Sequence, residues 1–239
     1  MIPFSPRLND SLDAEALAAI FRRSGRVQIV DFLDPASAAT LERSLLDSDQ
    51  WMQLINAGDK VFELSRATRA GFEPDRVAQL QEAIDAGARW GFQYRYEALR
   101  VSDDDRERAA AARPLDIFAQ FMCSPEVRRF LCIVIGSGAA CFADAQATCY
   151  SAGDFLTGHD DNVVGKGRLA AYVYNLTPVW RLEWGGLLLF HESDGTASAL
   201  IPSFNTLNLF AVPQIHSVSM VTSSTAAPRI SVTGWLRST

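Results

Sequence analysis

The pattern of apolar and polar positions changes near the middle of the chain. Between Ser11 and Arg23 apolar side chains recur at helical spacing, at Leu12, Leu17, Ile20 and Phe21. We expect this first helix to end at Gly25, because glycine adopts the backbone conformation that closes a helix. The N-terminal part is therefore predicted to be rich in helices.

Three further helix starts are marked by a polar residue followed by proline, at Asp34-Pro35, Glu73-Pro74 and Ser124-Pro125. An aspartate or serine accepts the free N–H groups of the first turn, and proline at the first helical position loses no hydrogen bond. Between the first helices, Val27 to Phe32 is typical of a strand. The segment from Trp51 to Leu64 is ambiguous and is interpreted as strand with loop.

From Ala139 onward the pattern is one of short apolar or alternating runs separated by Gly, Pro, Asn and Asp. This pattern is typical of an antiparallel β unit, and seven or eight such strands suit a jelly roll. The expected strands are Cys141 to Tyr150, Arg168 to Leu176, Gly186 to His191, Ser198 to Ile201, Leu207 to Val212, Ser217 to Val221 and Ile230 to Leu236.

The predicted fold class is α+β with a mainly β core, a double-stranded β-helix (jelly roll) with flanking N-terminal helices. We expect one domain over residues 1–239. It would consist of a helix-rich N-terminal support region at 1–137 and a double-stranded β-helix catalytic core at 138–239. The helical half is expected to pack outside the β half and to lend it a strand.

The composition argues against binding to nucleic acid or to an anionic membrane. The chain has 239 residues, 48% apolar and 21% charged, with a formal net charge of −6 and a pI near 5.1. Such a chain is a poor partner for nucleic acid or an anionic membrane. No basic and apolar leader and no apolar run of roughly 18 residues is seen. A cytoplasmic protein with four reduced, mostly buried cysteines is predicted. The pattern does not fix an oligomeric state.

Candidate chemistry begins at the three histidines of the chain. His159 and Asp161 are two apart and follow a predicted strand, so in extended chain both would face one metal ion. A third ligand must come from a distant strand, and His191 and His216 are both candidates. Two imidazoles and one carboxylate leave coordination positions open, as in non-haem Fe(II) oxygenases.

Arg229 adds a second function to this site. It begins the last predicted strand, 13 residues after His216. On neighbouring antiparallel strands of a barrel, its guanidinium would enter the same cavity as the metal. Because the planar guanidinium suits two carboxylate oxygens, the pair predicts a receptor for a dicarboxylate that chelates the metal at one end.

The C-terminal hundred residues resemble the catalytic domain of the 2-oxoglutarate- and Fe(II)-dependent prolyl 4-hydroxylase family. The nearest branch is that of bacterial and fungal proteins similar to ribosomal-protein prolyl hydroxylases. The residues that carry the resemblance are Cys149 to Leu156, His159 to Asp161, Gly167-Arg168, Tyr172 to Leu176, Trp180, Gly185 to Leu189, Pro202 to Asn205, Leu209-Phe210, His216 to Val218 and Arg229 to Trp235.

The resemblance implies roles for individual residues. The metal-binding, catalytic positions are His159, Asp161 and His216, which fall on the iron ligands of the family. Arg229 falls on the basic residue that binds the distal carboxylate of 2-oxoglutarate. The other implied co-substrate positions are Tyr150, Trp235 and Asn175, of which Asn175 stands where some members have a tyrosine.

The implied activity is a dioxygenase that hydroxylates a prolyl residue of a protein or peptide and releases succinate and CO2. Its implied cofactors are Fe(II), 2-oxoglutarate and O2, with ascorbate as a possible addition. Hydroxylation of a free amino acid or another small metabolite is the alternative substrate hypothesis. A catalytically silent jelly-roll binding module is the alternative of another class.

Two further interpretations complete the sequence analysis. Nucleic-acid demethylases share the two histidines and the aspartate, but they resemble each other in a second arginine where this chain has Trp235. The aromatic residues Trp90, Phe92, Tyr94 and Tyr96 alternate, which fits either a substrate wall or packing, and packing is favoured.

Overall fold

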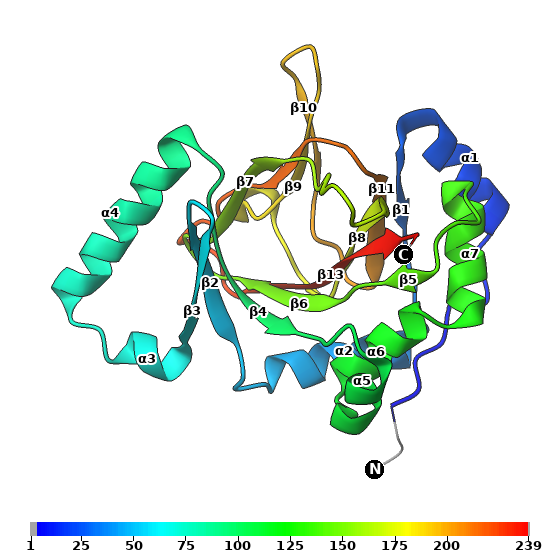
Figure 1. Cartoon of the computed structure of the whole chain (residues 1–239), viewed down its shortest axis with the longest axis horizontal. Helices are drawn as coiled ribbons and strands as arrows, with labels where there is room; N and C mark the ends of the chain where they lie inside the picture. The colour runs from blue at the N-terminus through cyan, green and yellow to red at the C-terminus, as the bar shows by residue number, and fades with distance from the viewer. Residues whose placement is uncertain (1–3, 239) are drawn as a thin grey trace.

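A computed structural model describes residues 4–238, which form a curled sheet with helices around it (Figure 1). Within these residues the helices are α1 (Ala14–Ser24), α2 (Pro35–Leu46), α3 (Arg66–Ala70), α4 (Pro74–Trp90), α5 (Asp105–Ala111), α6 (Pro114–Met122), α7 (Pro125–Ile135) and the 3-10 helix η1 (Leu182–Trp184). The strands are β1 (Arg26–Ile29), β2 (Met52–Ala57), β3 (Lys60–Ser65), β4 (Tyr94–Arg100), β5 (Phe142–Ala143), β6 (Gln146–Tyr150), β7 (Phe155–His159), β8 (Arg168–Asn175), β9 (Leu188–His191), β10 (Ala197–Leu200), β11 (Thr206–Ala211), β12 (His216–Val218) and β13 (Arg229–Arg237).

The helices begin where the local sequence predicts. Asp34 caps α2 through hydrogen bonds from the N–H groups of Ala36 and Ser37, with proline at the first helical position. Ser124 caps α7 in the same way. Helix α1 ends at Gly25, whose φ of 69° is the left-handed conformation that glycine adopts without steric cost.

The strands pair in the order β1-β11-β8-β13-β6-β4-β7-β12-β9-β10, with β2 on β4, β3 on β2 and β5 on β13. All of these pairs are antiparallel. The predicted fold class, a mainly β core with flanking helices, is confirmed. The N-terminal half contributes more than one strand, because β1 extends the sheet beside β11 and β4 lies between β6 and β7.

The main hydrophobic core is formed by residues of the helices α1, α2, α6 and α7 together with residues of the sheet. Figure 1 shows these four helices beside the sheet. On β8 the side chains alternate, so that Tyr172 and Tyr174 pack into this core while Ala171 and Val173 face the inside of the curl. Phe32 and Phe118 contact the Tyr174 ring from the helical side. The inner face is thereby left free to line a cavity.

Several strand predictions were incomplete. The run from Cys141 to Tyr150 is two strands, and the ambiguous segment from Trp51 to Leu64 is the β2–β3 hairpin. Strands β4 and β7 were not predicted. On β4 the inner positions are aromatic, whereas Arg95 and Glu97 on the outer face pair with charged partners. This mixture of buried and charged residues hides the alternation that marks a strand.

The cysteines are all free thiols, as expected. Their burial differs from the expectation, because only Cys149 is buried and Cys141 is exposed.

Asn205 connects the sheet to the chain before α2. Its side chain accepts from the N–H of Leu33 (3.0 Å) and the hydroxyl of Tyr174 (2.7 Å), and it donates to the carbonyl of Leu33 (2.8 Å). We expect Asn205→Ala to lower the free energy of unfolding by about 2–4 kcal/mol, because buried partners lose their hydrogen bonds. Urea unfolding measures this. Asn208→Ala, on the strand β11 that begins directly after Asn205, is the matched control, with one side-chain hydrogen bond from Gln28 and a smaller expected loss.

Candidate metal centre and its cavity

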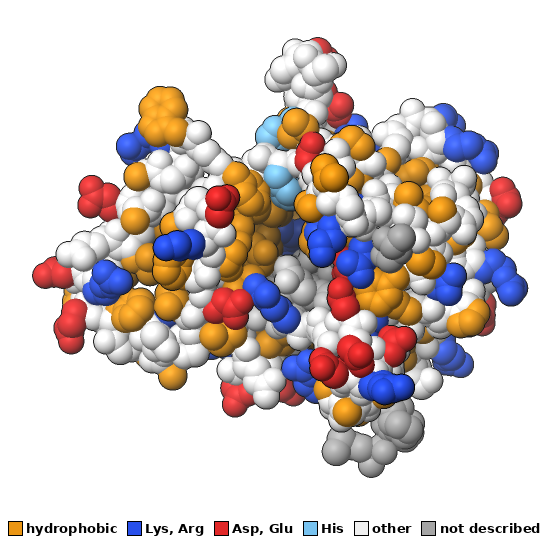
Figure 2. Space-filling view, viewed as in Figure 1, with side chains coloured by type: hydrophobic (Ala, Val, Ile, Leu, Met, Phe, Trp, Pro, Cys, Tyr) orange, Lys and Arg blue, Asp and Glu red, His pale blue; other side chains and the backbone are white. Residues whose placement is uncertain are grey.

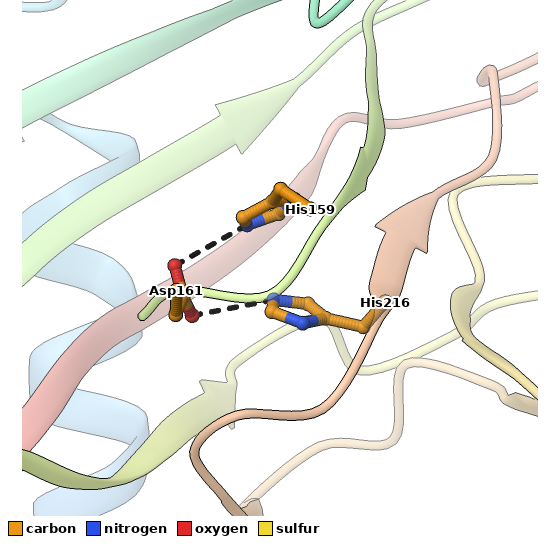
Figure 3. Close-up of side chains that lie close together, drawn as sticks. All are labelled: His159, Asp161 and His216. Atoms are coloured by element: carbon orange, nitrogen blue, oxygen red, sulfur yellow. Dashed lines mark ion pairs between the residues drawn. The ribbon is translucent and has the colours of Figure 1, made fainter. Parts of the chain in front are cut away.

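Three metal-ligating side chains converge at one end of the curled sheet (Figure 3). His159 is the last residue of β7, His216 is the first of β12, and the two are directly opposite in the strand register. Asp161 lies in the loop after β7. Its carboxylate oxygens are 3.3 Å from Nε2 of His159 and 3.4 Å from Nε2 of His216. One ligand atom from each residue lies within 4.8 Å of the others.

The backbone brings Asp161 to this place in an unexpected way. The prediction relied on an extended chain, in which residues two apart share a face. The strand instead ends at His159, and Asp161 has a φ of 61°. This left-handed conformation turns the carboxylate back toward both imidazoles. The pairing of His159 with Asp161 was predicted, but its geometric reason was not.

Both histidines are oriented by backbone carbonyls. Nδ1 of His159 is 3.1 Å from the carbonyl of Thr157, and Nδ1 of His216 is 2.8 Å from the carbonyl of Gln214. A carbonyl accepts only, so in the neutral ring Nδ1 carries the proton and Nε2 presents a lone pair. Two lone pairs and a carboxylate therefore meet at one point, which is the donor set of a divalent transition metal.

The carboxylate of Asp161 is ionised in this setting. Burial by itself would raise its pKa, but the contacts with His159 and His216 outweigh burial and hold the pKa well below its usual range. The residues thus fit a cation by charge as well as by geometry.

The structure places only one of the two candidates for the third ligand beside His159 and Asp161. His216 joins the cluster, whereas Nε2 of His191 lies 2.8 Å from the hydroxyl of Ser217 on the neighbouring strand. Within residues 4–238 the group formed by His159, Asp161 and His216 is the one set of three such side chains close enough to share an ion.

Arg229 lies in the same cavity, which has a volume of about 400 Å³. The side chain is fully buried, and among the described residues its Nε and Nη1 have no hydrogen-bond partner. Its guanidinium carbon is 5.2 Å from the centre of the Tyr150 ring, and burial lowers its pKa. A buried arginine without an acidic partner is costly unless an anion binds it. The cavity therefore fits a ligand with a carboxylate at its inner end.

The structure separates the other predicted co-substrate residues. Tyr150 and Trp235 both line the cavity. Asn175 is fully buried outside the cavity lining, and its amide donates to the carbonyls of Val173 and Thr206.

A row of aromatic rings lines one wall of the cavity. Phe92 lies just before β4, and Tyr94 and Tyr96 follow on the inner side of that strand. Neighbouring rings contact each other along this row, and the Tyr96 ring stacks on Tyr150 with centres 5.1 Å apart. Packing was the favoured interpretation of these residues. The rings do pack on one another, and they also line the cavity. Trp90 differs, because it ends α4 and is 89% exposed. Figure 2 shows histidines at the mouth of the hollow and hydrophobic side chains along one side of it.

The sequence analysis also missed two hydroxyls of this cavity. Thr148 and Ser231 line it and bond to each other at 2.9 Å. Thr148 alternates with Tyr150 on β6, so the period of a strand was a signal that could have identified it.

Asp154 is the residue before β7. It receives hydrogen bonds from Nε of Arg95, on the outer face of β4, and from the N–H of Ser151, both at 2.8 Å. Burial raises the pKa of Asp154 to about 6, despite these two donors. Because this value exceeds the pKa of an unfolded aspartate, the folded state binds the proton first as the pH falls. Ionised Asp154 therefore reduces stability above that pKa, and protonation removes the penalty.

We expect the unfolding free energy of the native protein, minus that of Asp154→Asn, to rise as the pH falls through about 6, by up to about 3 kcal/mol near pH 4. Urea unfolding of both proteins at several pH values measures it. The asparagine variant shares every other titrating group, so a difference that stays constant with pH contradicts the assignment.

None of the helices in the described part of the chain combines the length and the apolar content that a membrane span requires.

Comparisons with known proteins point to one superfamily. Residues 145–237 match the family described as the 2OG-Fe(II) oxygenase superfamily. Prolyl 3-hydroxylase OGFOD1 of Mus musculus is 34% identical over 100 residues, covering 38% of this chain and 18% of the relative. The chain thus spans under a fifth of the length of that relative.

Solved structures share the fold. A prolyl-4-hydroxylase of Pseudomonas putida superimposes with a TM-score of 0.57 at 19% identity, over 94% of this chain and 98% of that one. A prolyl hydroxylase of Trichoplax adhaerens gives a TM-score of 0.59 at 16% identity, over 94% of this chain and 89% of that one. The epimerase SnoN from nogalamycin biosynthesis gives 0.55 at 16% identity, over 93% and 81%.

The family match includes the positions of His159, Asp161, His216 and Arg229, and it confirms the resemblance seen in the sequence. The matched family implies Fe(II), 2-oxoglutarate and O2 as cofactors, and the cluster of His159, Asp161 and His216 could hold the metal ion. Residues 145–237 therefore resemble the 2OG-Fe(II) oxygenase superfamily, and the proteins similar to this chain in sequence or in fold include prolyl hydroxylases.

Proposed function

We propose that the protein is a 2-oxoglutarate- and Fe(II)-dependent dioxygenase that hydroxylates a prolyl residue of a protein or peptide and releases succinate and CO2. The observation that carries this proposal is the pairing of two features in one cavity. These are the three converging ligand atoms at its mouth and the buried Arg229 within it, whose Nε and Nη1 have no hydrogen-bond partner among residues 4–238.

In this proposal His159, Asp161 and His216 hold Fe(II) through two imidazole nitrogens and one carboxylate oxygen. Bound Fe(II) supplies the position at which O2 and 2-oxoglutarate react, so that 2-oxoglutarate is decarboxylated to succinate and one oxygen atom enters a C–H bond. Three protein ligands leave positions open for co-substrates, as in other non-haem Fe(II) oxygenases.

Arg229 binds the distal carboxylate of 2-oxoglutarate in this arrangement. Its unpartnered Nε and Nη1 are available as donors, and a carboxylate accepts two parallel hydrogen bonds from a guanidinium. Tyr150 and Trp235 flank the same ligand. Apolar side chains such as Leu156, Leu188 and Val218 complete the walls and exclude water, which strengthens the ion pair.

The substrate assignment rests on the relatives and on the aromatic wall. The relative from Mus musculus is a prolyl 3-hydroxylase, and the neighbour from Trichoplax adhaerens was solved with a peptide fragment of hypoxia inducible factor. Phe92 and Tyr94 offer ring faces near His159, where an apolar prolyl ring would pack.

The proposal extends to the organisation of the chain. One domain over residues 1–239 is supported by strand β4, which comes from the N-terminal half and pairs with β6 and β7 of the core. The free cysteines support a cytoplasmic setting. Ascorbate enters the proposal on the family resemblance alone.

The test measures succinate formed from 2-oxoglutarate by the metal-free protein after Fe(II) is added, with and without proline-containing peptides. We expect turnover that requires Fe(II), and peptides that gain one oxygen atom by mass spectrometry. Free L-proline is the control for the small-metabolite hypothesis. Bound Fe(II) without 2-oxoglutarate turnover would favour the silent binding module.

A further inference from the structure

Arg168 forms a hydrogen bond to the backbone of Asp161, at the opposite end of the loop that joins β7 to β8. It is the first residue of β8, and its Nη1 donates to the carbonyl oxygen of Asp161 at 2.9 Å. The same nitrogen is 3.9 Å from Oδ1 of the Asp161 carboxylate. The Arg168 side chain is only 16% exposed, so these contacts are largely shielded from water.

The residue held in this way has an uncommon backbone conformation. Asp161 has a φ of 61°, and a residue with a side chain there is strained by roughly 1–2 kcal/mol. The loop returns through Gly165 and Gly167, with φ of 81° and 56°, and delivers Arg168 to the Asp161 carbonyl. The left-handed turn is what aims the carboxylate at His159 and His216, so whatever fixes the turn also fixes the carboxylate.

Arg168 is itself immobilised by Trp235. Its guanidinium carbon is 3.6 Å from the centre of the indole ring, on the strand that pairs with β8. A planar guanidinium can stack on a ring while its edge donates a directed hydrogen bond, which a lysine ammonium cannot do. The Trp235 indole, the Arg168 guanidinium and the Asp161 carbonyl therefore form a continuous chain of contacts that holds the backbone of Asp161 in place.

We propose that Arg168 is a positioning residue for the metal centre, acting through Asp161 and resting on Trp235. The inference depends on the proposed metal site. Arginine stays protonated and has no lone pair to offer, so Arg168 cannot be a ligand. It sets the direction of the Asp161 carboxylate and thereby the affinity and geometry of the site.

The test is Co(II) binding to the metal-free protein without 2-oxoglutarate, followed by the visible spectrum of Co(II) and by competition with a chelator. We expect Arg168→Lys to weaken Co(II) binding by about 10- to 100-fold, the effect of removing an outer-shell partner, and to change the spectrum. Lysine keeps the charge, so these changes report the lost stacking and directed hydrogen bond.

Arg237→Lys is the matched control. Arg237 lies opposite Arg168 in the β8–β13 register, stacks on Phe142 and pairs with Asp144. It makes the same kind of contacts away from Asp161, so its replacement should leave Co(II) affinity and spectrum unchanged. An equal loss in both variants would show a general effect on the sheet and overturn the inference.

A second variant keeps the test decisive if Arg168→Lys does not fold. Trp235→Leu removes the stacking surface and should weaken Co(II) binding by about three- to tenfold. Native Co(II) affinity in whichever variant is folded overturns the inference. Failure of the proposed metal site has a different signature, because the native protein would then bind Co(II) no better than Asp161→Ala.

Discussion

Asp161→Ala is expected to remove Fe(II)-dependent 2-oxoglutarate turnover, with a loss of at least about a thousandfold. The carboxylate is the one anionic member of the cluster, and it lies between the two imidazoles at 3.3 and 3.4 Å. Without it two neutral nitrogens remain, and metal affinity should fall by more than the roughly 10- to 100-fold that an outer-shell partner contributes. Chelator competition and succinate release measure the two effects.

The neighbouring residue supplies the control for this experiment. Asp160 carries the same side chain one position earlier, but its carboxylate accepts the N–H of Asn162. Asp160→Ala should therefore retain metal affinity close to that of the native protein. If Asp161→Ala turns over 2-oxoglutarate as fast as Asp160→Ala, the metal centre has been placed on the wrong residues.

Arg229→Met is expected to affect ligand binding and stability in opposite directions. Binding of 2-oxoglutarate should weaken by about 10²- to 10³-fold, since a buried charge pair loses one partner. Without ligand the variant should unfold at higher urea concentration, because a fully buried and unpaired guanidinium is replaced by an apolar chain of similar length. Such an exchange of stability for binding is typical of functional sites.

Two measurements separate these effects. Anaerobic titration of the Fe(II) protein with 2-oxoglutarate, followed by the visible charge-transfer band, gives affinity. Urea unfolding of the metal-free protein gives stability. Lys60→Met is the control, because Lys60 is exposed at the β2–β3 turn. Loss of stability in Arg229→Met without loss of 2-oxoglutarate affinity would show that the guanidinium serves the fold.

The groups that line the cavity are already oriented before a metal ion or a co-substrate binds. The imidazole Nδ1 atoms are committed to the carbonyls of Thr157 and Gln214, so only the Nε2 atoms face the cavity. A carboxylate entering the cavity meets Nε and Nη1 of Arg229, which have no hydrogen-bond partner in the described part of the chain. Both features are formed by the protein alone, so little reorganisation is needed when ligands bind.

Much of the local structure was determined by the sequence itself. Asp34-Pro35 and Ser124-Pro125 start helices because an acceptor side chain and a fixed φ act within one turn. Most C-terminal strands were predicted from apolar runs, since each needs only its own alternation to be recognised. The candidate ligands and Arg229 were proposed from a motif, because their residue types and order suggest the chemistry, and in the structure they line one cavity.

The tertiary structure alone decided how these pieces meet. Strand β4 enters the sheet between β6 and β7, and this pairing turns Tyr96 toward Tyr150 to build the cavity wall. Asn175 falls outside the lining although its position in the motif suggested a ligand contact. Local propensity says nothing about which distant strands become neighbours.

The metal centre shows the same division. The sequence supplied His159, Asp161 and two candidates for the remaining ligand, and the short β12 strand brought His216 opposite His159. The left-handed turn at Asp161 is held by Arg168, which follows it by seven residues and donates to its carbonyl. Arg168 in turn stacks on Trp235, which lies on the neighbouring strand β13. A side chain's type is fixed by the sequence, but its direction depends on long-range contacts that only the folded chain makes.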